Sequence, residues 1–169
     1  NYNTNTLENF TGMFRYSEAL KTIDNADTAI LSNITKVKMY KFITPTLNSA
    51  LKYTLSFNNA FYNPHSGHNS DAGGILSSSS FKISGDTTND YFLNDDGQGN
   101  VRLYYVAGGV NVYTNNTLGT IDYTNGQIVL NSLNITSVGN VDGATSTAVR
   151  LTIIPNSVDV VPVRNQVLQ

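Results

Sequence analysis

The sequence predicts an α+β fold that is predominantly antiparallel β, with one short helix near its N-terminal end. Asn, Thr and Ser make up 57 of the 169 residues, and their short polar side chains compete with the helix backbone for hydrogen bonds. Charged residues are only 13% of the chain, against about a quarter in a typical soluble protein. Several segments alternate apolar and polar residues, as strands with one buried face do. This mixture disfavours an all-α bundle or a coiled coil.

The helix is expected at Tyr16–Asp24. Ser17 is placed to cap its first turn, and Ala19, Leu20 and Ile23 fall on one face of it. An irregular turn is expected to follow this short helix.

Two strands are expected next. In residues 34–43 the apolar Val37 and Met39 alternate with lysines, which predicts a strand with one wet face. Pro45 interrupts the pattern, and residues 51–57 then show the most regular period of two in the chain. We expect these two strands to pair antiparallel or to lie as near neighbours.

Residues 58–74 contain Pro64 together with several Gly and Asn residues and predict an irregular loop. A strand is expected around Phe81 and Ile83, followed by two hairpins. The first joins residues 91–93 to 101–106 through a wide turn, and the second joins 121–123 to 128–130 through Thr124, Asn125 and Gly126. Asn-Gly supplies the positive φ angles that a tight turn needs.

The last strand is expected in residues 148–154, where alternate residues are apolar before Pro155 ends the pattern. The valine-rich tail, residues 158–169, predicts a segment that continues or pairs with another chain. We divide the chain into a small α/β segment, residues 1–58, and a β-rich segment with two hairpins, residues 59–169. We expect the two to pack as one unit, and the missing initial Met suggests a fragment of a longer chain.

Charge and composition argue against several classes of function. The net charge of −2 gives no electrostatic reason to bind nucleic acid or an anionic membrane. The absence of Cys removes disulfides, thiolate metal sites and cysteine nucleophiles. No apolar run approaches the roughly 18 residues of a membrane span.

His65 and His68 are spaced to share a metal, with Asp71 as a further ligand, but two His residues in a Pro/Gly-rich loop are more often surface polar groups. The run Asn94–Gly97 lacks the calcium-loop spacing and is better interpreted as a hairpin turn. We therefore expect no metal and no cofactor.

No catalytic residue is predicted, because the chain offers no recognisable carboxylate pair and no nucleophile motif. The aromatic residues are compatible with a sugar-binding platform, although their strand positions favour the core or a sheet edge. The residues concerned are Tyr53, Phe57, Tyr104 and Tyr123. We expect a protein that is not an enzyme and has no small-molecule substrate.

Five stretches, in the same order along the chain, resemble the C-terminal part of the baseplate wedge subunit, the gene product six family, of T-even-type contractile-tailed bacteriophages. They are GMFRYSEALKTID at 12–24, SNITKVKM at 32–39, AGGILSSSSFKI at 72–83, GTIDYTNGQIVLNSLNI at 119–135 and PVRNQVLQ at 162–169. Their order, rather than any catalytic motif, carries the resemblance.

The resemblance implies a virion protein of the contractile viral tail, made in the host cytoplasm, that forms homodimers and contacts other baseplate wedge subunits in ring assembly. A two-fold dimer needs only one self-complementary patch. We expect the partner interface at the C-terminal cluster of Val160, Val163, Val167 and Leu168. The alternative is a tail module that binds carbohydrate or another receptor without catalysis, using the aromatic residues and the 58–74 loop.

Overall fold

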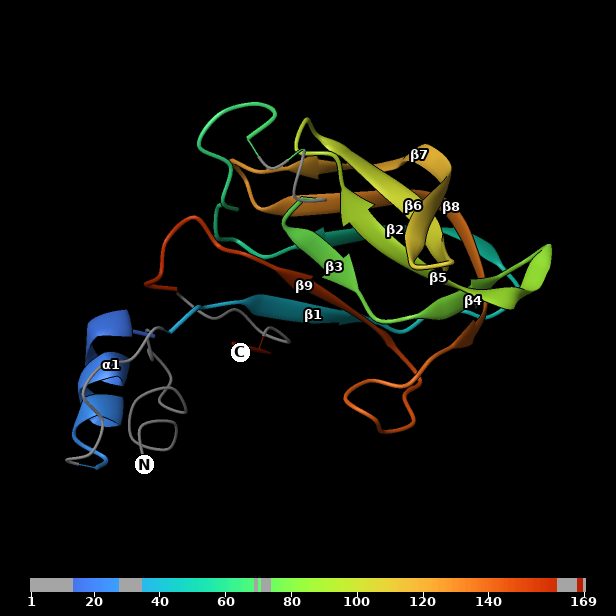
Figure 1. The fold of residues 1–169 in the computed structure, drawn as a ribbon. Helices are drawn as coiled ribbons and strands as arrows, with labels where there is room; N and C mark the ends of the chain where they lie inside the picture. The colour runs from blue at the N-terminus through green and yellow to red at the C-terminus, as the bar shows by residue number, and fades with distance from the viewer. Residues whose placement is uncertain (1–13, 28–34, 69, 71–73, 161–166, 169) are drawn as a thin grey trace.

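The computed structural model describes residues 14–27, 35–68, 70, 74–160 and 167–168. These residues form helix α1 and ten strands (Figure 1). The helix is α1 (Tyr16–Asp24), and the strands are β1 (Met39–Ile43), β2 (Ala50–Ser56), β3 (Leu76–Ser78), β4 (Phe81–Ile83), β5 (Asp86–Asp95), β6 (Asn100–Ala107), β7 (Val110–Asp122), β8 (Gln127–Val138), β9 (Val149–Ile153) and β10 (Val167–Leu168).

This architecture confirms the predicted fold class: the strands are antiparallel and the one helix is short and N-terminal. Helix α1 has the predicted bounds. Both predicted hairpins are present, as β5–β6 and as β7–β8. Two further hairpins were not predicted: β4–β5, which turns at Gly85, and β6–β7, which turns at Gly108 and Gly109.

Four strands form the smaller sheet, in the order β10-β1-β9-β3. Strand β1 pairs with β9 from Met39↔Ile153 to Ile43↔Val149, so residues far apart in the sequence meet along its whole length. The alternate apolar residues of β9 are buried, as their period of two predicts. This sheet buries one face and leaves the other partly exposed.

Six strands form the larger sheet, in the order β2-β8-β4-β5-β6-β7, and an additional pairing of β7 with β8 closes it on itself. Strand β8 is the central element because it pairs with β2, β4 and β7. Strands from both sides of residue 58 therefore share each sheet: β1 pairs with β9, and β2 pairs with β8.

The expected pairing of the two early strands is wrong. Strand β1 lies in the smaller sheet and β2 in the larger one, and each pairs with a strand from the second half of the chain. The chain crosses between the sheets through Pro45, which cannot donate a ladder hydrogen bond. One polar contact joins the two strands, from Lys41 Nζ to the carbonyl oxygen of Ser56 at 2.6 Å.

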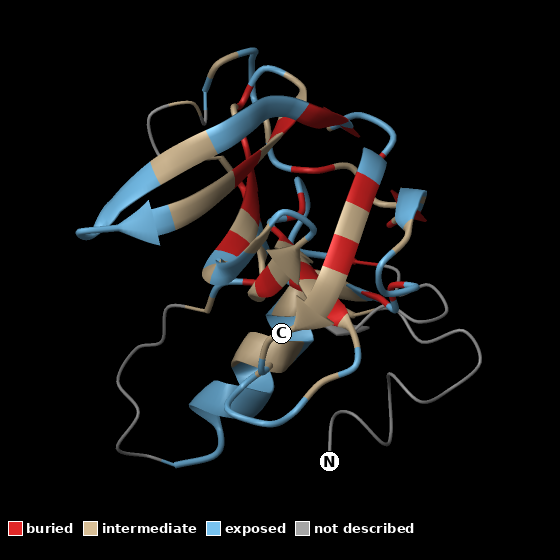
Figure 2. Ribbon diagram, turned by 90° about the vertical axis from the view of Figure 1, so that its right-hand side faces the viewer, coloured by how far each residue is buried: buried red, intermediate tan, exposed pale blue. Residues whose placement is uncertain are grey.

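Strands of both sheets contribute their buried side chains to one apolar core (Figure 2). Its largest fully buried side chains are Phe57, Phe61, Phe81 and Met39. The rings of Phe57 and Phe61 meet edge to face with centroids 5.3 Å apart. Burying a side chain of this size stabilises the fold by roughly 2–3 kcal/mol.

The described part of the predicted loop, residues 58–74, is irregular as expected. It is held down by backbone hydrogen bonds, because Phe61 N donates to Tyr123 O at 2.7 Å and Tyr62 N donates to Ile154 O at 3.0 Å. The loop therefore touches both sheets.

Candidate assembly surfaces

The C-terminal segment lies against the N-terminal one. Phe14 and Val160 form an isolated antiparallel bridge, in which Phe14 N donates to Val160 O at 3.0 Å and Val160 N donates to Phe14 O at 3.2 Å. The hydroxyl of Tyr16 donates to the carbonyl oxygen of Thr35 at 2.9 Å, which ties α1 to the residues that lead into β1. Residues near the two ends of the described chain, Phe14 and Val160, thus lie side by side.

The residues of the predicted partner interface lie in three different situations. Val160 is only 1% exposed and belongs to the apolar core of its own chain. Val167 and Leu168 form β10, where they pair with Tyr40 and Met39. Val163 lies outside the described residues. In the part of the chain that the structure describes, β10 is an edge strand with β1 on one side of it.

Helix α1 lies beside the sheets rather than within the core, and none of its residues is buried (Figure 1). The predicted Ser17 cap is wrong, because Arg15 is the N-cap residue and makes no side-chain cap hydrogen bond. Asp159 replaces it from the other end of the chain: its Oδ1 accepts a hydrogen bond from Tyr16 N at 2.8 Å. A carboxylate at this end of a helix interacts favourably with the helix dipole.

Asp95 is the most deeply buried polar side chain of the described residues, with 0% exposure. Its Oδ1 accepts hydrogen bonds from the backbone N–H groups of Ile75 at 2.6 Å and Leu76 at 2.8 Å. Its Oδ2 accepts from the Tyr123 hydroxyl at 2.6 Å and from Gly97 N at 3.3 Å. Buried carboxylates are tolerated when they are satisfied in this way. Asp95, at the end of β5 in the larger sheet, therefore fastens β3 of the smaller sheet.

This role of Asp95 is not predicted from the sequence, because the Asn-Asp-Asp-Gly run indicates only a turn. Gly74 is the signal that accompanies it: a β-carbon there would lie 1.9 Å from Asp95 Oδ1, so only glycine allows this approach. Burial raises the pKa of the Tyr123 phenol well above its ordinary value, and the hydrogen bond to Asp95 raises it further.

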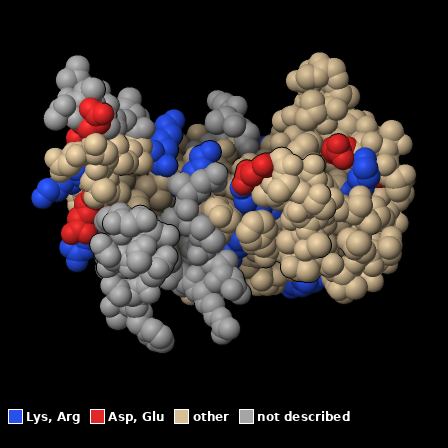
Figure 3. Space-filling view, turned by 90° about the horizontal axis from the view of Figure 1, so that it is seen from below, with Lys and Arg blue, Asp and Glu red and all other residues tan. Residues whose placement is uncertain are grey.

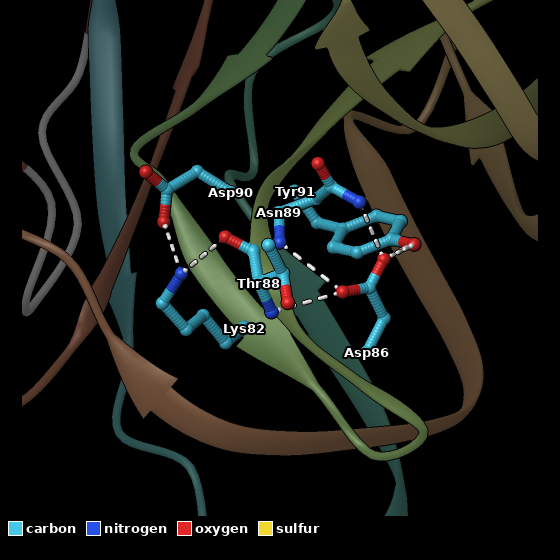
Figure 4. A network of polar contacts seen from close by, with 6 residues as sticks. All are labelled: Lys82, Asp86, Thr88, Asn89, Asp90 and Tyr91. Atoms are coloured by element: carbon cyan, nitrogen blue, oxygen red, sulfur yellow. Dashed lines mark hydrogen bonds and ion pairs between the residues drawn. The ribbon is translucent and has the colours of Figure 1, made fainter.

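Three further aspartates close tight turns in the same manner. Asp86, Asp96 and Asp122 each accept two backbone N–H groups and the side-chain amide of an Asn three or four residues later. Figure 4 shows the first of them, where Asp86 also accepts the Tyr91 hydroxyl at 2.9 Å. Beside it, Lys82 bonds the Thr88 carbonyl oxygen and pairs with Asp90 at 3.2 Å.

These hydrogen bonds shift the acidity of the groups involved. Bonds from Asn89, Thr88 and Tyr91 hold the pKa of Asp86 far below its ordinary value. Bonds from Asn125 lower the pKa of Asp122. Burial raises the pKa of Tyr91 to about 12, with a further contribution from its bond to Asp86. The four aspartates thus act as acceptors that organise backbone, which is a structural use of carboxylates.

His65 and His68 contact each other directly, with Nε2 of His65 3.1 Å from Nδ1 of His68. The Tyr62 hydroxyl lies 3.5 Å from Nε2 of His68. Asp71 lies outside the described residues. Among the described residues, no three His, Cys, Asp or Glu side chains gather as a metal site would require.

The aromatic residues are divided between core and surface. Phe57 is fully buried. Phe92, Tyr104 and Tyr113 form a half-buried row across β5, β6 and β7, with neighbouring ring centroids 5.7 and 5.5 Å apart. The guanidinium carbon of Arg102 lies 4.4 Å from the centroid of the Tyr113 ring. Tyr53 and Tyr123 pack half-buried against the core.

A cleft of about 300 Å³ adjoins the aromatic row where the two sheets meet. Its polar lining includes Lys38, Ser77 and Thr152 on the side of the smaller sheet and Asn94, Tyr104 and Asn111 on the side of the larger one. Separately, no helix in the described residues has both the length and the apolar character needed to cross a membrane.

Comparison with known protein families adds a decisive observation. Residues 1–42 match the family model of the baseplate structural protein gp6, C-terminal domain III. The resemblance to the baseplate family is confirmed. The gp6 match covers a quarter of the 169 residues. No curated protein and no solved structure matches the chain.

Within the structure, the gp6 match contains Phe14, helix α1 and all but the last residue of β1. These are the parts that receive the C-terminal segment: Phe14 bridges Val160, and β1 pairs with both β9 and β10. The gp6-like segment is therefore joined by backbone hydrogen bonds to residues near the other end of the chain.

Proposed function

We propose that this chain is a structural module of a bacteriophage tail baseplate that forms homodimers and joins wedge subunits in ring assembly. The observation that carries the proposal is the gp6 match. The matched residues include most of β1, the strand of the smaller sheet that pairs with both β9 and β10. In this role the protein is a virion component that is made in the host cytoplasm and carries out no catalysis.

The surface chemistry supports an assembly role. Figure 3 shows one face of the molecule, on which the described surface over the sheets is mostly uncharged, with few Lys, Arg, Asp and Glu side chains. Interfaces between proteins are depleted of charged residues at their centres. Uncharged polar side chains form hydrogen bonds across a contact without the desolvation cost of an unpaired ion.

We propose that the C-terminal segment contributes a partner interface through Val163, Val167 and Leu168, while Val160 anchors this segment to its own chain. Strand β10 supports this interface, because it is an edge strand whose outer side has no partner among the described residues. Edge strands are ready templates for pairing with another chain.

A binding experiment tests this proposal. Val163→Asp is expected to weaken binding to the other wedge subunits, because it places a charge in an apolar contact. Val158→Asp, at an exposed position of the same tail, serves as the matched control. Unchanged binding in the Val163 variant, with the fold intact by circular dichroism, would place the interface elsewhere.

A second candidate function is carbohydrate binding without catalysis. The cleft beside Tyr104 favours it, because this cleft combines an aromatic ring with amide and hydroxyl groups. Sugars present hydroxyls to such polar groups and apolar faces to aromatic rings. A glycan array with Tyr104→Ala and the control Tyr62→Ala tests the idea. Glycan binding lost only in the Tyr104 variant would support it, and no binding by the unchanged chain would refute it.

A further inference from the structure

The outer edge of β7 is unpaired near the β6–β7 turn. Strand β7 pairs with β6 from Val110 onward, but it pairs with β8 only from Gly119 to Asp122. Among the described residues, no strand pairs with the other side of residues 110–118. In an antiparallel ladder, alternate residues turn their N–H and C=O groups away from the paired neighbour. This edge therefore presents backbone donors and acceptors that no described strand pairs, although Thr117 N donates to Asn115 Oδ1.

The β7 edge lacks the charges that usually protect an edge strand from pairing. No charged residue occurs from Leu103 through Ile121. Strand β2, which pairs only with β8, carries the exposed Lys52 in its interior. The free side of β3 is occupied by Asp95, which bonds Ile75 and Leu76. Protection of the edge by a charged side chain is thus present on β2 and β3 and missing on β7.

The same hairpin exposes large apolar side chains at its tip. Val110 is 66% exposed and Val106 is 50% exposed, the two highest values among the large apolar residues that the structure describes. The tip itself is a tight turn through Gly108 and Gly109, both with positive φ. Figure 2 shows this hairpin projecting from the body, so a partner can reach it without meeting the rest of the molecule.

We propose that β7 adds to β7 of a second copy of this chain, as antiparallel strands related by a two-fold axis. The regular run is Val110–Tyr113, because the pairing with β6 shifts between Tyr113 and Asn115. The same strand run antiparallel to itself is self-complementary, and two-fold contacts are the commonest in oligomers. An uncharged strand pairs with its copy without like-charge repulsion, and the contact brings Val110 of each copy against the partner strand.

This inference rests on the proposed self-association and identifies its surface. It assigns the contact between copies to β7 and leaves the C-terminal segment for other wedge subunits. The occupant is a second copy because residues 103–121 carry no charge, so the strand meets its own copy without like-charge repulsion.

Single-cysteine variants test the pairing directly, because the chain has no cysteine of its own. Cys is placed in turn at Val110, Asn111, Val112 and Tyr113, with Thr54→Cys on the charged edge β2 as control. Mild oxidation is expected to give disulfide-linked dimers, with the highest yield at the position closest to the two-fold axis. Equal low yields at all four positions and at the control would overturn the proposal.

Light scattering on Val110→Lys provides the second test. Because this change adds a charge and removes apolar burial in both copies, the dissociation constant of the dimer is expected to rise about tenfold or more. Thr54→Lys is the control and should leave it unchanged. A dimer that survives Val110→Lys and does not crosslink through β7 refutes this surface while the proposed assembly function stands. A chain that is monomeric in its unchanged form refutes self-association itself.

Discussion

Gly74 lies so close to Asp95 that a β-carbon at Gly74 would stand 1.9 Å from Oδ1 of the buried carboxylate. This contact lets the chain leading into β3 pass over the end of β5, where Asp95 receives the N–H groups of Ile75 and Leu76. The junction of the two sheets thus depends on Gly74, which has no side chain, and on the buried carboxyl group of Asp95.

Gly74→Ala is expected to destabilise the fold by about 2–4 kcal/mol, because the added methyl group displaces Asp95 and strains a positive φ. Gly85→Ala is the matched control: its φ is also positive, at +92°, but no atom lies within 4 Å of the position. Urea unfolding of both variants separates the collision from the backbone strain. An equal loss of unfolding free energy in the two variants would contradict the close contact between Gly74 and Asp95.

Asp95→Asn is expected to lower the free energy of unfolding by about 2–4 kcal/mol, because it turns an amide NH₂ group toward donors that need an acceptor. The size and shape of the side chain are preserved, so the loss reports hydrogen bonding. Asp90→Asn, at an exposed position, should change the free energy of unfolding by less than about 0.5 kcal/mol. An unchanged free energy of unfolding in Asp95→Asn would mean that the four hydrogen bonds to this carboxyl group do not stabilise the fold.

The lowered pKa values of Asp86, Asp96 and Asp122 predict acid sensitivity. A carboxyl group whose pKa is depressed by folding contributes stability above its unfolded pKa of about 3.9, and this is lost as the pH falls through the folded value. Thermal midpoints should stay level from pH 7 to about pH 5 and decline below about pH 4. The double variant Asp86→Asn, Asp122→Asn should be less stable at pH 7 and show a shallower decline. An identical slope would show that other groups control acid unfolding.

Asp159→Ala is expected to loosen helix α1, because Tyr16 N loses its acceptor at the helix start. Amide exchange at Tyr16 should become about threefold to tenfold faster, with little change in the core strands. Ser17→Ala is the control and should have no such effect, since Ser17 does not cap the helix. Faster exchange in the Ser17 variant alone would restore the local cap that the sequence suggests.

Much of the local structure follows from the sequence because it depends on near neighbours. The apolar residues of β9 alternate, so its buried face is evident before any partner is known. The Asn125-Gly126 turn has the positive-φ glycine that its residue types predict. The bounds of α1 follow similarly from a short amphipathic run.

The failures concern partners that lie far apart in the sequence. The alternation in β1 shows that it has a buried face but does not say that β9, rather than β2, lies beside it. Asp95 sits in a run typical of turns, and its four donors become visible only when β3 and Tyr123 are brought to it. Val160 belongs to a valine cluster that suggested an interface, yet Phe14 covers it from the other end of the chain.

The central claim, that this chain is a self-associating assembly module, is tested most directly by light scattering on a size-exclusion column across a range of protein concentrations. We expect a particle of about 37 kDa, twice the 18.4 kDa of the chain, and the fraction of the protein in this particle should grow with concentration. A mass that stays at 18.4 kDa at every concentration would contradict it.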